Sequence, residues 1–292
     1  MTLKVLVLGR TGMLGHMVFN VLSGDAALVV NGTHIADESD LFYFNVEMGL
    51  EKLEHICLVS GEYDYIINCI GLTADKIKPT VSTSLVRVIN LNSLFPHQLA
   101  EFALKKKIRV IHMSTDGVFS HAAGCCREDA PHDCTDTYGK TKSLGEVLTG
   151  ANVLNIRCSI VGPSPFEKGG LFESFRSQPE GAEVRGYTNH RWNGVTTLQF
   201  AQLCHWLIKE SEFDNVIRES CVHHFCPNRE VTKYELLTAF NQAMGERRKI
   251  VPYEHEEYPL NRVLATKYKS LQKSSGHTRD MQSVVKELIE LN

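Results

Sequence analysis

Apolar strands that alternate with helical segments, the first strand running into a glycine-rich turn, predict an α/β protein built on a doubly wound parallel sheet. The first strand is expected at 4–8, and later apolar runs lie at 27–30, 65–71, 108–113 and 153–157. Helical periodicity follows the glycine turn and recurs at 86–102, 198–209, 233–244 and 281–291. Strands buried in a parallel sheet are almost continuously apolar, as these are. The chain of 292 residues can form one large domain or two closely joined ones.

The glycine-rich turn is the clearest nucleotide-binding feature of the sequence. Its glycines are spaced Gly-x-x-Gly-x-x-Gly, which allows a tight turn, close approach of the backbone to a pyrophosphate, and close helix packing. The N–H groups at the start of the following helix favour the phosphate charge. We therefore expect a Rossmann-type dinucleotide site. The residues predicted to form it are Gly9, Arg10, Thr11, Gly12, Met13, Leu14 and Gly15.

The end of the second strand bears on which dinucleotide is bound. A site for NAD usually has an acidic residue here that binds the ribose hydroxyls, but the sequence continues Asn-Gly-Thr-His at 31–34. Arg10 lies in the glycine turn, where its charge could meet a 2′-phosphate. NADPH is therefore favoured, with NADH as the alternative. Thr33, and Asn45 with Val46 beside the adenine, are further predicted contacts.

Tyr138 and Lys142 are the candidate catalytic pair. Residues four apart on one helix lie on the same face, with Cβ atoms roughly 5–6 Å apart. A nearby ammonium favours the phenolate and lowers a tyrosine pKa that is ordinarily about 10. A tyrosine tuned in this way can exchange a proton with an alcohol oxygen near neutral pH.

Composition excludes several classes of function. A net charge of -3 gives no argument for binding nucleic acid or a membrane surface, and no apolar run is long enough to span a bilayer. The first residues lead directly into a strand, so no signal peptide is expected. The nine cysteines are scattered and match no zinc spacing. We expect reduced thiols, no metal site, and a cytoplasmic protein.

Four motifs in this order resemble the extended short-chain dehydrogenase/reductase family. They are the glycine turn, Asn68-Cys69-Ile70-Gly71, Ser114-Thr115-Asp116, and Tyr138-x-x-x-Lys142. The run Ser-Thr-Asp-x-Val-Phe at 114–119 most resembles the dTDP-4-dehydrorhamnose reductase-like branch. The resemblance is clearest up to about residue 160 and continues more loosely to the end of the chain.

The resemblance implies roles for individual residues. Thr115 would polarise the substrate carbonyl, Tyr138 would donate the proton, and Lys142 would hold the nicotinamide ribose and lower the tyrosine pKa. Asn92 would support Lys142, and the backbone at Cys69, Ile70 and Gly71 would line the cofactor. The predicted substrate contacts are Thr73, Ser114, Asp116, Arg191 and Trp192, of which Trp192 is equally compatible with a core position.

The implied organisation is a Rossmann domain over 1–157 and a smaller, mostly α-helical substrate-binding part over 158–292. The segment near 190–212 is expected to pack back on the first domain. Relatives are often dimers, so a homodimer is a further expectation.

The implied reaction is NAD(P)H-dependent reduction of a nucleotide-linked 4-keto-6-deoxysugar for cell-surface polysaccharide precursors. A nucleotide-sugar epimerase and a non-catalytic NADP-binding regulatory subunit are the alternatives. Two departures, Gly117 and Ile160, replace residues that are commonly aromatic in the branch, so we expect an altered sugar pocket.

We expect the protein to bind NADPH more tightly than NADH, because Arg10 can meet the 2′-phosphate and no acid directly follows the second strand. Fluorescence titration of each dinucleotide measures the two dissociation constants. Equal dissociation constants for the two dinucleotides, or tighter NADH binding, would show that Arg10 does not favour NADPH.

Overall fold

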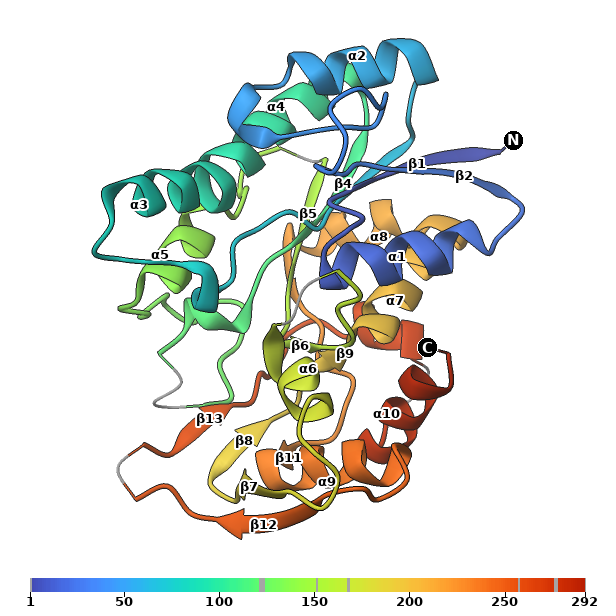
Figure 1. The fold of residues 1–292 in the computed structure, drawn as a ribbon. Helices are drawn as coiled ribbons and strands as arrows, with labels where there is room; N and C mark the ends of the chain where they lie inside the picture. Colours follow the sequence, from blue (N-terminus) through green and yellow to red (C-terminus); the bar gives the residue numbers. More distant parts are fainter. Residues whose placement is uncertain are drawn as a thin grey trace.

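The computed structural model describes residues 2–120, 124–150, 152–166, 169–256, 258–275 and 278–291. At its centre is a six-stranded parallel sheet with the order β10-β5-β4-β3-β1-β2 (Figure 1). Its strands are β1 (Leu3–Leu8), β2 (Leu28–Gly32), β3 (Tyr65–Asn68), β4 (Arg109–Met113), β5 (Val153–Arg157) and β10 (Val222–His224). The predicted α/β fold with a doubly wound parallel sheet is confirmed.

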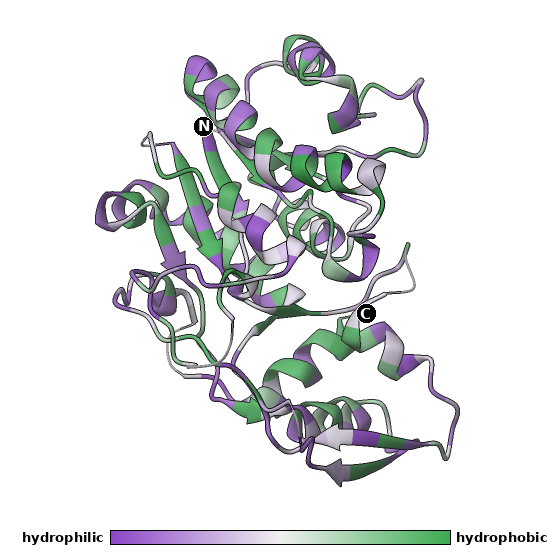
Figure 2. Ribbon diagram, turned by 90° about the vertical axis from the view of Figure 1, so that its left-hand side faces the viewer, coloured by the Kyte–Doolittle hydropathy of each residue, from purple (hydrophilic) through white to green (hydrophobic). Residues whose placement is uncertain are grey.

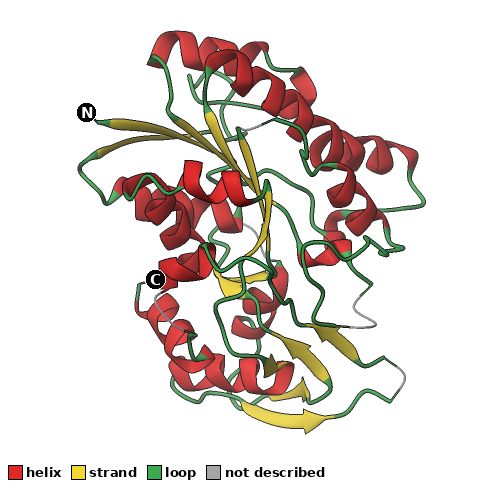
Figure 3. Ribbon diagram, turned by 180° about the vertical axis from the view of Figure 1, so that it is seen from behind, coloured by secondary structure: helices red, strands yellow, loops and turns green. Residues whose placement is uncertain are grey.

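Helices cover both faces of this sheet (Figure 3). On one face lie α1 (Met13–Ser23), α7 (Thr197–Lys209) and α8 (Phe213–Glu219), and on the other lie α2 (Glu51–Ser60) and α4 (Phe95–Lys106). Within the described residues, no helix is both long and apolar enough to cross a membrane.

Alternation along the strands divides the core into two halves. In β1, Val5 and Val7 pack under α1 and α7, whereas Leu6 and Leu8 pack under α2 and α4. Successive side chains of a strand point to opposite faces, so a sheet covered on both sides needs apolar residues at every position. Figure 2 accordingly shows mostly hydrophobic residues in the central strands.

The strand order reverses beside β1, which lies between β2 and β3. The chain passes from β1 through α1 to β2, and then through α2 back past β1 to β3. Such a reversal leaves a crevice outside the carboxyl ends of the two strands, where ligands bind in this class of fold. The glycine turn and residues 69–71 both lie at that edge.

A π-helical turn interrupts the long helical segment expected around 86–102. Regular helix α3 (Ser82–Ile89) passes into the turn η3 (Asn90–Leu94), and α4 resumes at Phe95. Pro96 lies in the first turn of α4, where its missing N–H costs little. The irregular turn therefore lies just before the proline, and it carries Asn92.

The rest of the chain contains more strand than the sequence suggested. Its helices are α6 (Gly170–Arg176), α9 (Lys233–Ala243) and α10 (Met281–Glu290). Three small sheets have the orders β11-β8-β13, β12-β7 and β6-β9 (Figure 1). Their strands are β6 (Ile160–Val161), β7 (Glu183–Tyr187), β8 (His190–Trp192), β9 (Val195–Thr196), β11 (Val231–Thr232), β12 (Lys249–Tyr253) and β13 (Leu260–Arg262). Strands this short leave too few residues for a recognisable alternation.

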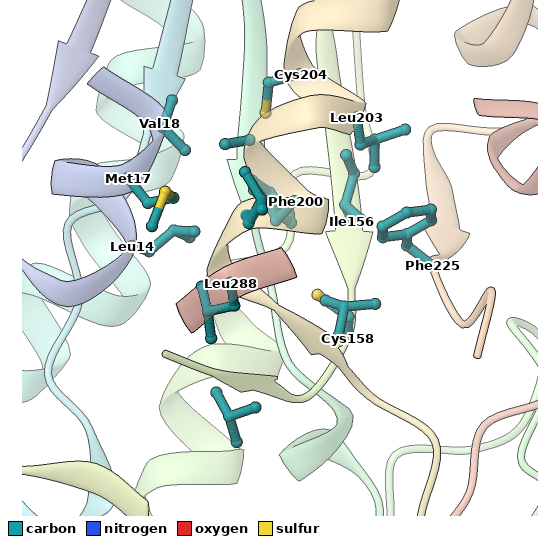
Figure 4. Close-up of a cluster of buried hydrophobic side chains, with 14 of the residues drawn as sticks. Leu14, Met17, Val18, Ile156, Cys158, Phe200, Leu203, Cys204, Phe225 and Leu288 are labelled. Carbon is teal, nitrogen blue, oxygen red and sulfur yellow. The ribbon is translucent and has the colours of Figure 1, made fainter. Parts of the chain in front are cut away.

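Helix α7 returns to the central sheet and packs along α1. Figure 4 shows Leu14, Met17 and Val18 of α1 on one side of Phe200 of α7, and Leu203 of α7 on the other side with Ile156 and Phe225. The sixth strand of the sheet, β10, ends in His223 and His224, and both side chains are fully buried.

Gly15 and Gly12 should respond differently to an added methyl group. A Cβ on Gly15 would lie 2.1 Å from the Gly9 carbonyl oxygen, so the backbone must shift, whereas on Gly12 it would lie at 3.4 Å. We expect Gly15→Ala to lower the free energy of unfolding by about 1–3 kcal/mol. Gly12→Ala is the matched control and should change it by less than about 0.5 kcal/mol. Urea unfolding measures both, and equal losses would contradict this packing.

Candidate active site

The predicted catalytic residues meet where the end of β4 packs on the helix α5 (Thr137–Leu144). The 3-10 turn η4 (Asp116–Val118) follows β4, and Thr115 caps it by accepting a hydrogen bond from the Gly117 N–H at 3.0 Å. Asp136 caps α5 in the same way, accepting from the Gly139 N–H at 2.9 Å. The two caps fix the catalytic turn and the catalytic helix beside each other.

Glycines allow this contact to be close. A Cβ on Gly139 would lie 2.3 Å from the Gly117 carbonyl oxygen, and a Cβ on Gly117 would lie 3.1 Å from the Tyr138 ring. The Thr115 hydroxyl is therefore within hydrogen-bond reach of the Tyr138 phenol. Thr115 and Tyr138 form one polar pair at the carboxyl end of β4.

Tyr138 has a higher pKa than the helix spacing predicted. Burial raises the pKa of Tyr138 to about 12, with a lowering contribution from Thr115 and a raising one from Asp116. The cation that lowers this pKa is Arg262, not Lys142. The prediction that Lys142 produces a lowered tyrosine pKa was therefore wrong for this structure, and the phenol is protonated at neutral pH.

The side chain of Lys142 is bound by the backbone of β4. Its Nζ donates to the Met113 carbonyl oxygen at 2.7 Å, and the side chain is buried. Burial lowers the pKa of Lys142 to about 8, against the raising effects of Glu146 and Cys69. The ammonium has three N–H donors, and this is its one hydrogen bond among the described residues.

Asn92 supports the catalytic helix rather than the lysine itself. Its Oδ1 accepts from the Leu72 N–H at 2.8 Å, and its Nδ2 donates to the Leu72 carbonyl at 2.9 Å. Nδ2 also lies 3.4 Å from the Thr141 hydroxyl, next in sequence to Lys142. Ser93 adds a hydrogen bond to the Thr141 carbonyl at 2.8 Å. The π-helical turn thus fixes both α5 and the loop after β3.

The glycine turn forms a cradle that fits a pyrophosphate. Gly9 has φ +79°, and the Gly12 N–H donates to its carbonyl at 3.0 Å. Helix α1 begins after Gly12 with no side-chain cap and no acidic residue in its first turn. Its first N–H groups are therefore available to an anion.

Thr33 holds this cradle from beneath. It is fully buried, and its hydroxyl accepts from the Gly9 N–H at 3.0 Å while its carbonyl accepts from the Arg10 N–H at 2.9 Å. Cys69, Ile70 and Gly71 follow β3 on the other side of the turn, and the Ile70 side chain comes within 3.1 Å of a Cβ built on Gly9. The segments predicted to line the pyrophosphate are therefore adjacent.

Arg10 lies over the Phe19 ring, 5.4 Å from its centroid. A carboxylate, that of Asp40, also lies close enough to Arg10 to interact with its charge. The pKa of Asp40 is lowered by a hydrogen bond from the Phe42 N–H and, to a smaller degree, by His34 and Arg10. The sequence showed no acid directly after β2, and this carboxylate comes from the next loop. Asn45 accepts from the Glu47 N–H at 3.1 Å, and Val46, like Ile70, packs against the border of the core between the sheet and α2 and α4.

A buried ion pair lies under the catalytic turn, and the sequence analysis missed it. Arg157 donates to Glu146 through Nε and Nη2, each at 2.7 Å, and Ser114 donates to the same carboxylate at 2.5 Å. Arg157 also donates to His132 at 2.7 Å and to His224 at 3.3 Å. Burial raises the pKa of Glu146, but hydrogen bonds from Arg157 and Ser114 outweigh it and hold the pKa below its ordinary value.

Three predicted substrate contacts are engaged inside the protein instead. Ser114 is 1% exposed and is bound to Glu146, so it supports the turn from below. Asp116 is also 1% exposed and is paired with Arg262, whose Nε and Nη2 donate to it at 2.9 and 3.2 Å. Trp192 is 7% exposed and belongs to the core. Their burial depends on partners elsewhere in the chain, Trp192 takes the core position that was left open, and contacts of these three residues with a substrate stay a prediction.

Two predicted substrate contacts remain accessible. Arg191 is half exposed and forms an ion pair with Glu230. Thr73 is exposed and precedes the turn η2 (Ala74–Lys76). A Cβ on Gly169 would lie 3.5 Å from an oxygen of Asp75, so this turn faces the start of α6. Their contacts with a substrate stay a prediction.

The sequence positions of two residues that the sequence analysis missed could have indicated their importance. Glu146 lies four residues after Lys142, and Arg157 ends the strand β5, so both were close to recognised motifs. Arg262 has no local signal, because it lies 146 residues from its partner in a three-residue strand.

The glycine turn and the side chains of Thr115, Tyr138 and Lys142 thus lie at the carboxyl edge of a Rossmann-like parallel sheet. The family model described as the RmlD substrate binding domain matches residues 3–282, and the chain belongs to this family. No curated protein matches the sequence significantly.

Solved structures show the same fold at low identity. A dTDP-4-dehydrorhamnose reductase from Bacillus anthracis in complex with NADP has a TM-score of 0.76, 13% identity, and coverage of 100% of both chains. The enzyme of that name from Yersinia enterocolitica has a TM-score of 0.74 and 18% identity over 99% of both chains. A dTDP-glucose 4,6-dehydratase from Bacillus anthracis in complex with NAD has a TM-score of 0.69, with 15% identity over 99% of this chain and 96% of that one.

Breaking the buried ion pair should be costly. In Glu146→Gln the Arg157 charge stays buried without its partner, so we expect the free energy of unfolding to fall by about 3–5 kcal/mol. Asp214→Asn, which breaks the surface pair with Arg109, is the control and should cost about 0–1 kcal/mol. Urea unfolding measures both.

The pH dependence gives a second check. Because the Glu146 pKa is lowered in the folded state, its contribution is present at neutral pH and lost as pH falls through that folded value. The difference between wild type and Glu146→Gln should therefore shrink in acid. A difference of less than about 1 kcal/mol at neutral pH would contradict a stabilising role.

Proposed function

We propose that this protein is an NAD(P)H-dependent reductase of a nucleotide-linked 4-keto-6-deoxysugar, acting in the synthesis of cell-surface polysaccharide precursors. The observation that carries the proposal is the meeting of Thr115, Tyr138 and Lys142 at the sheet edge beside the glycine cradle. Family membership supports a dTDP-4-dehydrorhamnose reductase-like reaction, and the nucleotide and the sugar are part of the proposal.

A protonated tyrosine suits the reducing direction. Tyr138 is a phenol at neutral pH, with a pKa of about 12, so it carries the proton that a newly formed alkoxide needs. The alkoxide is a stronger base than the phenolate, so the transfer is favourable. Thr115 stands beside the phenol and would hydrogen-bond the same oxygen, holding the carbonyl for attack.

A nicotinamide cofactor would supply hydride to the carbonyl carbon. The cradle at Gly9 to Gly15 would hold its pyrophosphate through backbone N–H groups. Lys142 keeps two N–H donors beyond its bond to Met113, and these would hold the ribose hydroxyls. Arg10 favours a 2′-phosphate and Asp40 favours ribose hydroxyls, so NADPH remains our proposal with NADH as the alternative.

The sugar would lie between the catalytic turn and the C-terminal part. Gly117 lies against the Tyr138 ring, and Ile160 begins the short strand β6. Aromatic residues are common at both positions in the rhamnose branch, so a different 4-keto sugar nucleotide is the expected substrate. Thr73 and Arg191 are the proposed polar contacts.

Tyr138→Phe should lower turnover by about 100- to 10,000-fold, because it removes the proton donor. NADPH affinity should be kept, since the phenol is not needed to hold the cofactor. Lys142→Ala should lower turnover and also weaken NADPH. The double variant should lose much less than the product of the two losses, because the residues act together. Tyr258→Phe, at an exposed tyrosine, is the control.

Absorbance of NADPH with a panel of 4-keto-6-deoxy nucleotide sugars gives turnover, and fluorescence gives affinity. Wild-type turnover in Tyr138→Phe would mean that the proton comes from elsewhere. If NADPH binds but no sugar nucleotide of the panel is reduced, the non-catalytic regulatory subunit becomes the better interpretation.

A further inference from the structure

Arg262 connects the C-terminal part of the chain to the catalytic turn. It ends β13, and its guanidinium makes two hydrogen bonds to Asp116, at 2.9 and 3.2 Å. Asp116 follows Thr115 directly, and the Thr115 hydroxyl lies 3.3 Å from the same carboxylate oxygen that receives Arg262 Nη2. A residue from the far end of the chain thus shares an acceptor with the hydroxyl proposed to hold the substrate carbonyl.

The ion pair is asymmetric in its burial. The Asp116 side chain is 1% exposed, whereas that of Arg262 is 38% exposed. A carboxylate buried to this degree is costly unless a cation and hydrogen bonds compensate it. The Asp116 carboxylate would otherwise face Tyr138 unneutralised, at the point where negative charge forms during proton transfer.

The backbone around Arg262 is fixed on both sides. The Leu264 N–H donates to the Asn193 side chain at 2.9 Å, and the Val263 carbonyl accepts from the Cys125 N–H at 2.7 Å. β13 is also paired in parallel with β8. Arg262 therefore reaches Asp116 from a defined position of the C-terminal part, not from a loose loop.

We propose that Arg262 is a positioning residue that makes the catalytic turn competent by neutralising Asp116, so that Thr115 and Tyr138 are aligned only when β13 is docked on the turn. This rests on the proposed reductase function. Arg262 acts through Asp116, and the effect follows from charge and hydrogen bonding rather than from contact with the reacting atoms.

The charged and titratable groups around Asp116 determine the effect of removing its partner Arg262. They are Arg262 on β13, Tyr138 on α5 and Cys158 after β5, while Asp136 faces Arg262 from the start of α5. No second cation is among these groups. Without the guanidinium, the Asp116 carboxylate would stay buried beside Tyr138 without a cation, and Asp116→Asn would remove that uncompensated charge.

The test uses four variants of the full chain. Arg262→Met removes the charge, Arg262→Lys keeps it without the two-pronged geometry, and Asp116→Asn removes the acceptor charge. The fourth is the double variant Arg262→Met with Asp116→Asn. Arg109→Met is the matched control, because Arg109 is exposed to nearly the same degree as Arg262 and also makes a two-pronged ion pair, with Asp214, at the opposite end of β4 from the catalytic turn.

The first readout is turnover at neutral pH with a verified 4-keto sugar nucleotide. We expect Arg262→Met to lower kcat by up to about 100-fold with little change in the KM for NADPH. The double variant should recover kcat, because Asp116→Asn removes the buried charge that Arg262→Met leaves without a partner. Arg262→Lys should be intermediate, and Arg109→Met should behave as wild type.

The second readout does not need activity. In protein labelled at the tyrosine ring carbons, the Tyr138 signal, assigned with Tyr138→Phe, should be shifted from its wild-type position in Arg262→Met at neutral pH and should return toward that position in the double variant. Absence of this shift, or wild-type kcat in Arg262→Met at neutral pH, overturns the proposal. If wild type reduces no sugar nucleotide, the proposed function fails, and the Tyr138 signal alone decides whether Arg262 controls the charge beside that residue.

Discussion

The buried ion pair between Glu146 and Arg157 is the interaction on which the catalytic end of the molecule depends. It joins the segment after α5, the end of β5, Ser114 at the end of β4, and His224 of β10. A buried ion pair contributes little net stability compared with apolar residues, because desolvation offsets the attraction. The pair instead fixes geometry. The planar guanidinium of Arg157 holds its N–H donors in fixed directions, so the four segments can be bound in only one arrangement.

The catalytic turn lies between this pair and a second one. Ser114 is bound to Glu146 below, and Asp116 is bound to Arg262 from the side. Thr115, between them, has neighbours fixed on both sides. Such support fits the role that we propose for Thr115 in holding a substrate oxygen, because small displacements of reacting groups lower rates strongly.

The features that could be predicted from the sequence are those with a local signature. The strands of the central sheet, the glycine cradle and the tyrosine–lysine spacing each occupy a few consecutive residues. The partners of Ser114 and Asp116 could not be predicted, because Glu146 and Arg262 lie far from them along the chain. Asp116 and Arg262, for example, are 146 residues apart.

The pKa of Tyr138 also could not be predicted from the sequence, although Lys142 is only four residues away. Helix spacing places the Cβ atoms of Tyr138 and Lys142 together, but the lysine charge lies at the end of a flexible four-carbon chain. In the structure that charge is bound to the Met113 carbonyl, and burial then controls the tyrosine. Spacing on a helix therefore does not determine which group a long side chain binds.

The sixth strand of the central sheet has a consequence for how the chain is made. β10 pairs with β5, yet residues 222–224 leave the ribosome well after residue 157. At about 5–20 residues per second, the edge of β5 and the apolar face that α7 covers stay open for several seconds. An open apolar edge is a template for pairing with other chains. During synthesis this protein is thus exposed to aggregation until the segment up to His224 has emerged, and fragments that end near residue 157 would keep that exposed edge permanently.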